Sequence, residues 1–254
     1  MRYQHAEARR PLLHPQLTPV YRVFDFHLSR CQAAPMCGRK YASEELTWAE
    51  YREALDITGT PPNTNFQPNY NIAPTHVMPV AVHESTQHVL RPMMWGLVPT
   101  WAKDATRSYN MINARAETLE EKPSFKNLLK SCRCAVLVSG FYEWKRDGKT
   151  KQAYRIERAD GEPMILAGLW AENGYLETTT YSIITTNATP AFGPIHNRLP
   201  AILERDQVAT WLHGQWSHAK SMTEPYSGDL DVKPVGNAVG NVRNNYAELL
   251  EVKN

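Results

Sequence analysis

Apolar residues recur in short runs along the chain, and turn-forming residues fill the gaps between them. Two runs, 76–82 and 87–94, flank the polar turn at 84–86, and this pattern predicts a β-hairpin. The same pattern predicts five further strands, at 134–143, 153–158, 164–170, 181–186 and 232–235. The 18 prolines are spread between the runs, which is typical of many short elements joined by fixed turns.

Helices are expected at only three places, which are 46–55, 124–130 and 205–212. We predict Ser43 as the N-cap of the first, because Glu44 and Glu45 follow it and acidic residues favour the first helical turn. Because strands dominate, the predicted fold is a mixed α+β domain. Its core is a curved, largely antiparallel, barrel-like sheet with a few flanking helices.

The first 35 residues differ from the rest. They mix proline, histidine and arginine without a helical or strand period, and they lack the apolar core of about 7–15 residues that a secretory signal needs. We interpret residues 1–35 as a disordered extension, a mis-assigned start or a removed propeptide, and 36–254 as a single domain. No apolar run approaches the ~18–20 residues of a membrane span, so we expect no membrane association.

Charge is uneven along the chain. The net charge is +2, but residues 1–35 hold five arginines against two acidic residues, which leaves 23 basic and 24 acidic residues in the remainder. Nucleic-acid-binding domains are usually more basic than this. Any DNA binding would therefore depend on a local group of arginines and not on a general positive field.

The four cysteines, Cys31, Cys37, Cys132 and Cys134, include no CxxC pair, and no histidine lies at zinc-ligand spacing from them. We therefore expect no metal. A disulfide framework is not expected in a chain of this size with so few cysteines. This composition predicts free thiols in a reducing, cytoplasmic compartment.

One of these cysteines has special chemistry in the segment Met36-Cys37-Gly38-Arg39. Removal of an initiator methionine at position 36 would leave Cys37 with both a thiol and a free α-amine, which together close a thiazolidine ring on an aldehyde. The α-amine has a reference pKa near 7.7–8.0, so part of it is neutral at pH 7. A nearby cation such as Arg39 favours the thiolate. The alternative is that Cys37 is a small buried apolar residue.

Three other segments carry candidate groups for proton transfer and positioning. Asn113 can accept from an amine and donate to a sugar oxygen, and Arg115 close by can bind a phosphate. Glu143 ends an apolar run between aromatic residues, where desolvation would raise its pKa. His196 lies in a loop bounded by proline and can act as an acid or a base near pH 7. The alternatives are a polar turn, a salt-bridged glutamate at a strand end and a solvated loop histidine.

Two tryptophans, Trp95 and Trp101, flank a short loop that contains glycine and proline. Aromatic faces stack on unpaired bases with about 1–3 kcal/mol each, so this loop is a candidate contact for single-stranded DNA. Burial of both rings in the core is the alternative.

Six segments occur together in a fixed order. They are Met36-Cys37-Gly38-Arg39, Pro68-Asn69-Tyr70-Asn71-Ile72-Ala73-Pro74-Thr75, Trp95-Gly96-Leu97-Val98-Pro99, Asn113-Ala114-Arg115-Ala116-Glu117-Thr118, Gly140-Phe141-Tyr142-Glu143-Trp144 and Ile195-His196-Asn197-Arg198-Leu199-Pro200. In this content and order the chain strongly resembles the SRAP (SOS response-associated peptidase) family, whose members shield abasic sites. The resemblance runs from Met36 to about Val235.

The resemblance implies roles for the candidate groups. Cys37 would be the N-terminal nucleophile that joins the ring-opened abasic sugar as a thiazolidine. Asn113 would position its amine and the sugar, and Glu143 would assist proton transfer during ring opening and linkage. His196 would protonate the sugar oxygen or an imine and assist reversal. One acid and one histidine in different environments suit this chemistry, which needs no cofactor.

The resemblance also implies a DNA-binding set, namely Arg39, Arg115 and Arg198 as phosphate contacts, Trp95 and Trp101 along the path of the strand, and Pro74. The implied partner is single-stranded DNA with abasic sites, bound during the DNA damage response. A monomer is the default expectation for a chain of this size and surface. The protein would be cytoplasmic and associated with the nucleoid when it is bound to DNA.

With residues 1–36 attached, Cys37 has an amide in place of its amine and cannot form a thiazolidine. We therefore expect that the protein either starts at Met36 or loses the extension. Family members are thought to cleave themselves before this cysteine. Two other functions remain open: a thiol peptidase, with Cys37 attacking a peptide bond and His196 as its base, and a single-strand-binding module without chemistry.

Overall fold

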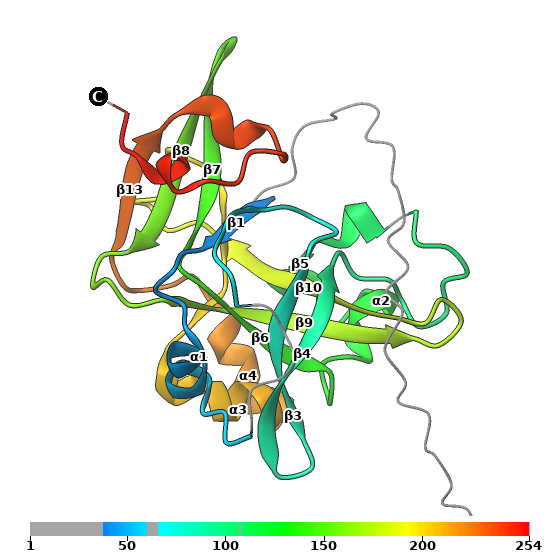
Figure 1. The fold of residues 1–254 in the computed structure, drawn as a ribbon. Helices are drawn as coiled ribbons and strands as arrows, with labels where there is room; N and C mark the ends of the chain where they lie inside the picture. Colours follow the sequence, from blue (N-terminus) through cyan, green and yellow to red (C-terminus); the bar gives the residue numbers. More distant parts are fainter. Residues whose placement is uncertain (1–37, 60–65, 107, 254) are drawn as a thin grey trace, which may run out of the picture. The chain divides into compact units, whose positions relative to one another are not determined.

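The computed structural model describes residues 38–59, 66–106 and 108–253, so the predictions for the extension and for Cys37 lie outside the described residues. Five strands form a closed ring in which each strand pairs with two others (Figure 1). In ring order they are β3 (Val77–Glu84), β4 (Gln87–Trp95), β10 (Thr178–Asn187), β9 (Met164–Asn173) and β6 (Arg133–Val138). The barrel-like core predicted from the sequence is therefore confirmed.

The ring strands are apolar because both of their faces are covered. Every residue of β6 is buried, and so are six successive residues at the start of β9. Three short strands extend the ring, namely β5 (Asn113–Arg115), β11 (Arg198–Pro200) and β12 (Ile202–Leu203). Among the described strands only the β4–β10 and β5–β10 pairs are parallel, so the largely antiparallel prediction holds.

A second sheet has five strands. In spatial order they are β13 (Leu230–Val235), β8 (Thr150–Arg158), β7 (Gly140–Asp147), β1 (Arg39–Ala42) and β2 (Asn69–Ile72). The single strand predicted at 134–143 is wrong, because the chain leaves β6 at Ser139 and enters β7 in this other sheet. Gly140 permits the crossing, since a Cβ there would clash with the carbonyl oxygen of Ile156.

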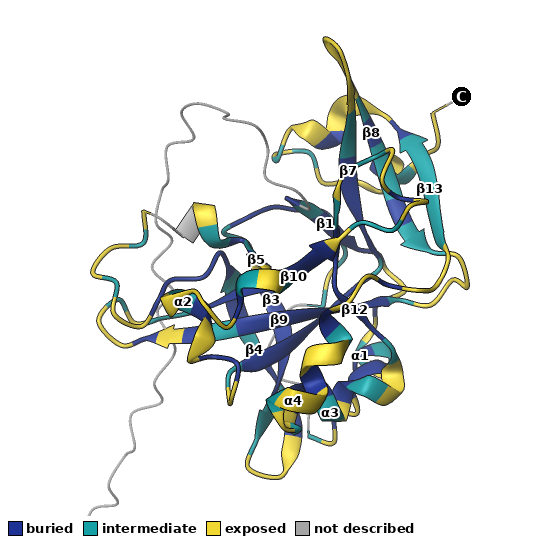
Figure 2. Cartoon of the chain, turned by 180° about the vertical axis from the view of Figure 1, so that it is seen from behind, coloured by how far each residue is buried: buried dark blue, intermediate teal, exposed yellow. Residues whose placement is uncertain are grey.

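The predicted hairpin is confirmed as β3 and β4, and the remaining predicted strands lie within β8, β9, β10 and β13. The helices are α1 (Trp48–Leu55), α2 (Pro123–Lys126), α3 (Val208–His213) and α4 (Trp216–Ala219). Short 3-10 turns lie at Ser108–Met111, Ala116–Thr118, Arg205–Gln207, Lys220–Thr223, Asn237–Gly240 and Ala247–Leu250. Figure 2 shows that α1, α3 and α4 expose their outer faces while the ring strands beside them are buried. None of the helices in the described ranges is long and apolar enough to cross a membrane.

The first helix begins later than predicted. Thr47, and not Ser43, is its N-cap, and the Thr47 side chain accepts a hydrogen bond from the backbone of Glu50. Ser43 instead follows the end of β1, where its hydroxyl lies 2.9 Å from that of Ser139. Both serines are therefore engaged at the junction between the two sheets, which removes Ser43 from the helix.

Candidate functional site

The start of β1 lies against β7, and this pairing sets the predicted acid close to the beginning of the domain. Arg39 lies opposite Tyr142 in the antiparallel register, so the next step along both strands brings Gly38 beside Glu143. Glu143 is only 5% exposed, and its carboxylate accepts a hydrogen bond of 3.0 Å from the following backbone N–H. Cys37 is the residue before Gly38 and lies outside the described residues.

The last residues of β10 carry two other predicted segments, one on each edge. On one edge, Asn113 of β5 lies opposite Ile183; on the other, β11 pairs with residues 185–187. His196 is two residues before β11, and its Nδ1 accepts the backbone N–H of Arg198 at 3.0 Å. Because Nδ1 is an acceptor, the neutral ring carries its proton on Nε2, from which it can donate.

Arg198 joins these two segments through its side chain. Its guanidinium donates to both carboxylate oxygens of Glu117, at 2.6 and 2.8 Å, and to Asn187 Oδ1 at 2.7 Å and the carbonyl of Thr185 at 2.5 Å. The hydrogen bonds from Arg198 lower the pKa of Glu117. The charge of Arg198 is thus paired within the protein, and its side chain is only 13% exposed.

The other predicted DNA-binding residues divide by exposure. Trp101 is 68% exposed and Arg115 is exposed, while Arg39 is half-buried. Trp95 is 1% exposed and Pro74 is buried. A buried indole offers no face to a base, so Trp95 can affect a bound strand only through the residues it supports, whereas Trp101 is open to direct stacking.

A buried lysine connects β1 to the ring, and sequence reasoning missed it. Lys40 is 1% exposed; its ammonium donates to the hydroxyl of Tyr181 at 2.8 Å and lies 3.5 Å from the centre of the Trp95 ring. Cation–π contacts are strengthened when both partners are desolvated. The alternation of β1 gave no signal for this burial, because Tyr41, on the opposite face of the strand, is as buried as Lys40.

His76 is a second residue that the sequence interpretation passed over. It is half-buried at the start of β3, and its pKa is lowered first by burial and then by the positive charges of Arg39 and Lys40. The imidazole is therefore neutral at pH 7, and it lies close enough to the two basic residues that begin β1 to be affected by their charges. A histidine next to a turn that contains proline was the signal in the sequence.

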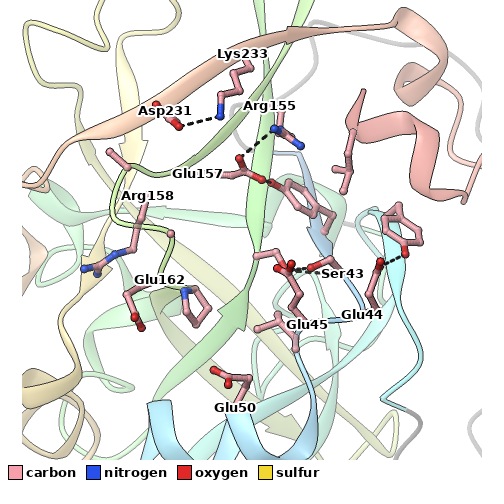
Figure 3. A pocket seen from close by; sticks show the side chains of 18 of the residues that line it. Ser43, Glu44, Glu45, Glu50, Arg155, Glu157, Arg158, Glu162, Asp231 and Lys233 are labelled. Carbon is pink, nitrogen blue, oxygen red and sulfur yellow. Dashed lines mark hydrogen bonds and ion pairs between the residues drawn. The ribbon is translucent and has the colours of Figure 1, made fainter. Parts of the chain in front are cut away.

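A hollow of about 740 Å³ lies elsewhere, against the second sheet (Figure 3). Seven acidic and four basic residues line it, and Tyr41 donates a hydrogen bond to Glu157 in its wall. None of the predicted site residues belongs to its lining. The excess of carboxylates repels phosphate, so this hollow does not suit a DNA strand.

The architecture is that of a closed ring and a second sheet, with Asn113, Glu143 and His196 placed by β5, β7 and β11. The chain matches the family model "SOS response associated peptidase (SRAP)" over residues 36–242. This protein therefore belongs to the SRAP family, as the six ordered segments predict.

Its relatives span bacteria and vertebrates. "Abasic site processing protein YoaM" of Bacillus subtilis is 36% identical over 227 residues, which cover 86% of this chain and 99% of that protein. "Abasic site processing protein YedK" of Escherichia coli is 33% identical over 72% of this chain and 83% of that protein. "Abasic site processing protein HMCES" of Xenopus tropicalis is 33% identical over 73% and 66%, respectively.

Solved structures have the same fold. A Bacteroides thetaiotaomicron protein aligns with a TM-score of 0.61 and 28% identity over 66% of this chain and 78% of that one. A Bordetella bronchiseptica protein aligns with a TM-score of 0.66 at 20% identity, over 79% of this chain and all of the other, and it shows the fold alone.

Proposed function

We propose that this protein captures abasic sites in single-stranded DNA by forming a thiazolidine through the amine and thiol of Cys37. The observation that carries this proposal is the family match, which begins at Met36, one residue before Cys37. The names of three relatives, all abasic site processing proteins, support the same substrate. The adduct would shield the lesion during the DNA damage response.

The proposed chemistry balances with loss of one water. The ring-opened sugar presents an aldehyde; the α-amine of Cys37 adds to its carbon, and loss of the carbonyl oxygen as water leaves an imine. The thiol sulfur then adds to the same carbon, and its proton passes to the nitrogen. This requires that residues 1–36 be absent, either because synthesis starts at Met36 and this methionine is then removed, or because Cys37, Glu143 and His196 remove the whole segment.

The surrounding groups have distinct tasks in this proposal. Glu143, buried beside the start of β1, moves protons during ring opening. His196, with its donor at Nε2, protonates the sugar oxygen or the imine. Asn113, on the opposite edge of β10 from β11, orients the amine and the sugar. None of these tasks calls for a metal or an organic cofactor.

Binding of the strand is proposed to use few phosphate contacts. Arg115 and Arg39 supply positive charge, and Trp101 supplies a stacking face. Arg198 and Trp95 contribute without contacting the DNA. Arg198 holds the segment that contains His196, and Trp95 supports Lys40. The domain acts as a monomer in this proposal.

Intact mass spectrometry tests the proposal. Protein that starts at Cys37 is mixed with single-stranded DNA bearing one abasic site, and we expect a denaturation-resistant species at the summed mass less one water. Cys37→Ala and the chain that retains residues 1–36 should give none, while Cys132→Ala, a control at a half-buried cysteine, should react normally.

Three results would overturn the proposal. Absence of the species, with Cys37 shown to be free and N-terminal, removes the aminothiol mechanism. An adduct that survives acetylation of the α-amine would indicate a thiol reaction alone, as in a thiol peptidase. If the parent protein forms no adduct and Cys37→Ala binds DNA as well as the parent, the protein would be a single-strand-binding module without chemistry.

A further inference from the structure

Three histidines come together at the turn end of the β3–β4 hairpin, far from the segments described above. His83 and His88 are cross-strand partners in this hairpin, and His213 is the last residue of α3, which packs beside it (Figure 1). The ring centres of His83 and His213 are 4.3 Å apart, and His88 lies 5.7 Å from the first and 5.5 Å from the second. One nitrogen from each ring can be chosen so that all three lie within 4.8 Å of one another.

The hydrogen bond of His88 leaves its Nε2 unprotonated and able to bind a metal. His88 is 5% exposed, and its Nδ1 lies 2.8 Å from the carbonyl oxygen of Leu55. A carbonyl oxygen only accepts, so Nδ1 must carry the proton and Nε2 keeps its lone pair. Metal-binding histidines usually donate their second N–H to a carbonyl or carboxylate in this way, which fixes both the tautomer and the ring orientation.

His83 provides an independent sign. Its Nδ1 is buried and has no hydrogen-bond partner among the described residues. A buried polar nitrogen without a partner is costly in a folded protein. Coordination to a metal would satisfy this atom.

Burial, and then His83, His88 and the positive charge of Arg133, lower the pKa of His213. Arg133 is therefore a charged group that acts on the cluster. Its guanidinium is held by the carbonyl oxygens of Leu129, Trp211 and Gly214, and so points at backbone acceptors. Neutral imidazoles are the form that binds metals, although a nearby cation weakens binding.

We propose that His83, His88 and His213 bind one divalent transition-metal ion of the zinc class, with a water as fourth ligand. Zinc–nitrogen bonds of about 2.0–2.1 Å at tetrahedral angles separate the ligand nitrogens by about 3.3 Å. The rings must therefore approach by about 1.5 Å at most. His213 is exposed at the end of its helix, so its side chain can supply most of this movement.

The ion would act as a clamp between the hairpin and α3. It would not take part in the proposed DNA chemistry, because β4 runs from His88 to Trp95 over about 23 Å. Three imidazoles without a thiolate favour Zn²⁺, Co²⁺, Ni²⁺ or Cu²⁺ over Mg²⁺ and Ca²⁺. This proposal is independent of the proposed function.

The test uses the full chain after removal of metal with EDTA and dialysis. Co²⁺ is added first, as the probe, and we expect the visible absorption of a four-coordinate complex to saturate at one ion per chain and to disappear on addition of Zn²⁺. Zn²⁺ at a hundredfold excess over Kd should raise the Tm by about 5–10 °C.

Two variants decide the result. His213→Ala, at an exposed position where the fold should tolerate it, is expected to lose the absorption and the Tm rise. His218→Ala, at an exposed histidine of α4 outside the cluster, should keep both. Equal Co²⁺ binding by His213→Ala and the parent would place the metal at other histidines or cysteines, and absence of binding by the parent would remove the site; either result overturns the proposal.

Discussion

The pair formed by Arg198 and Glu117 allows a quantitative test of how the segment with His196 is held. We consider Glu117→Gln, which keeps the size of the side chain and removes its charge. Hydrogen bonds to charged groups contribute about 1.5–3 kcal/mol, whereas exposed ion pairs contribute about 0–1 kcal/mol. The Arg198 side chain is 13% exposed and that of Glu117 is 45% exposed, so this pair lies between the two cases. We expect a loss of about 1–2 kcal/mol in the free energy of unfolding, or about 2–8 °C in Tm.

The stabilisation by this pair should depend on pH in a defined direction. Arg198 lowers the pKa of Glu117 in the folded protein, so the carboxylate stabilises the fold fully above the unfolded pKa of about 4.3. The stabilisation is lost as the pH falls through the lower, folded pKa. The difference between the parent and Glu117→Gln should therefore be full at pH 7 and should vanish in acid.

Urea denaturation at a series of pH values measures this difference. Glu120→Gln is the matched control on the neighbouring turn, because Glu120 pairs with Lys220 where both side chains are more than half exposed, at 51% and 57%. We expect the control to change the free energy of unfolding by less than about 0.5 kcal/mol. A difference for Glu117→Gln that is absent at pH 7, or independent of pH, would refute the assigned role of the pair.

The same variant distinguishes two roles of Arg198. If Arg198 holds the His196 segment, Glu117→Gln should slow adduct formation on abasic DNA. If Arg198 instead binds a DNA phosphate, loss of its ion pair with Glu117 should tighten DNA binding. Rates of adduct formation and affinities for intact single strands, measured together, separate these outcomes.

Three further predictions concern the proposed site. His196→Asn, whose Oδ1 can still accept the Arg198 N–H, should slow adduct formation by about 10²–10⁴-fold in single-turnover assays with the Tm unchanged, and an unchanged rate would exclude proton transfer by this ring. Trp101→Ala should weaken single-strand binding by about 1–3 kcal/mol, whereas Trp95→Ala should lower the free energy of unfolding by about 3–5 kcal/mol; the reverse pattern would contradict their exposures. Arg115→Ala should reduce the slope of log K against log salt by about 0.7, and an unaltered slope would mean that Arg115 meets no phosphate.

Sequence patterns correctly predicted those strands and turns that are determined by neighbouring residues in the chain. The β3–β4 hairpin follows from two apolar runs around one turn, and the strands at 153–158, 164–170, 181–186 and 232–235 lie where alternation places them. The break at Ser139 was missed because apolar runs flank it closely on both sides, although the dipeptide Ser139-Gly140 is one that can mark a turn. Thr47 was missed as an N-cap because Ser43 carries the same signal and its hydrogen bond to Ser139 depends on tertiary contact.

Long-range relations were beyond sequence patterns alone. Closure of the ring joins β4 to β10, about ninety residues apart, and no periodicity records that pairing. The cluster of His83, His88 and His213 arises in the same way, since its third member comes from a distant helix. Burial of Trp95 against Lys40 likewise depends on where β1 meets the ring. The order of the six family segments, by contrast, identified the family.

The flanking of β10 by β5 and β11 has a consequence for the timing of maturation. Asn113 and His196 take up their places only when both short strands have joined the end of β10, and β10 is itself among the later strands of the chain. Removal of residues 1–36 by the protein's own side chains, as proposed, would thus have to wait until the chain is synthesised through β11, which ends at Pro200, and the ring is closed. The α-amine and thiol of Cys37, which together react with aldehydes, would then be exposed only on molecules that have already folded.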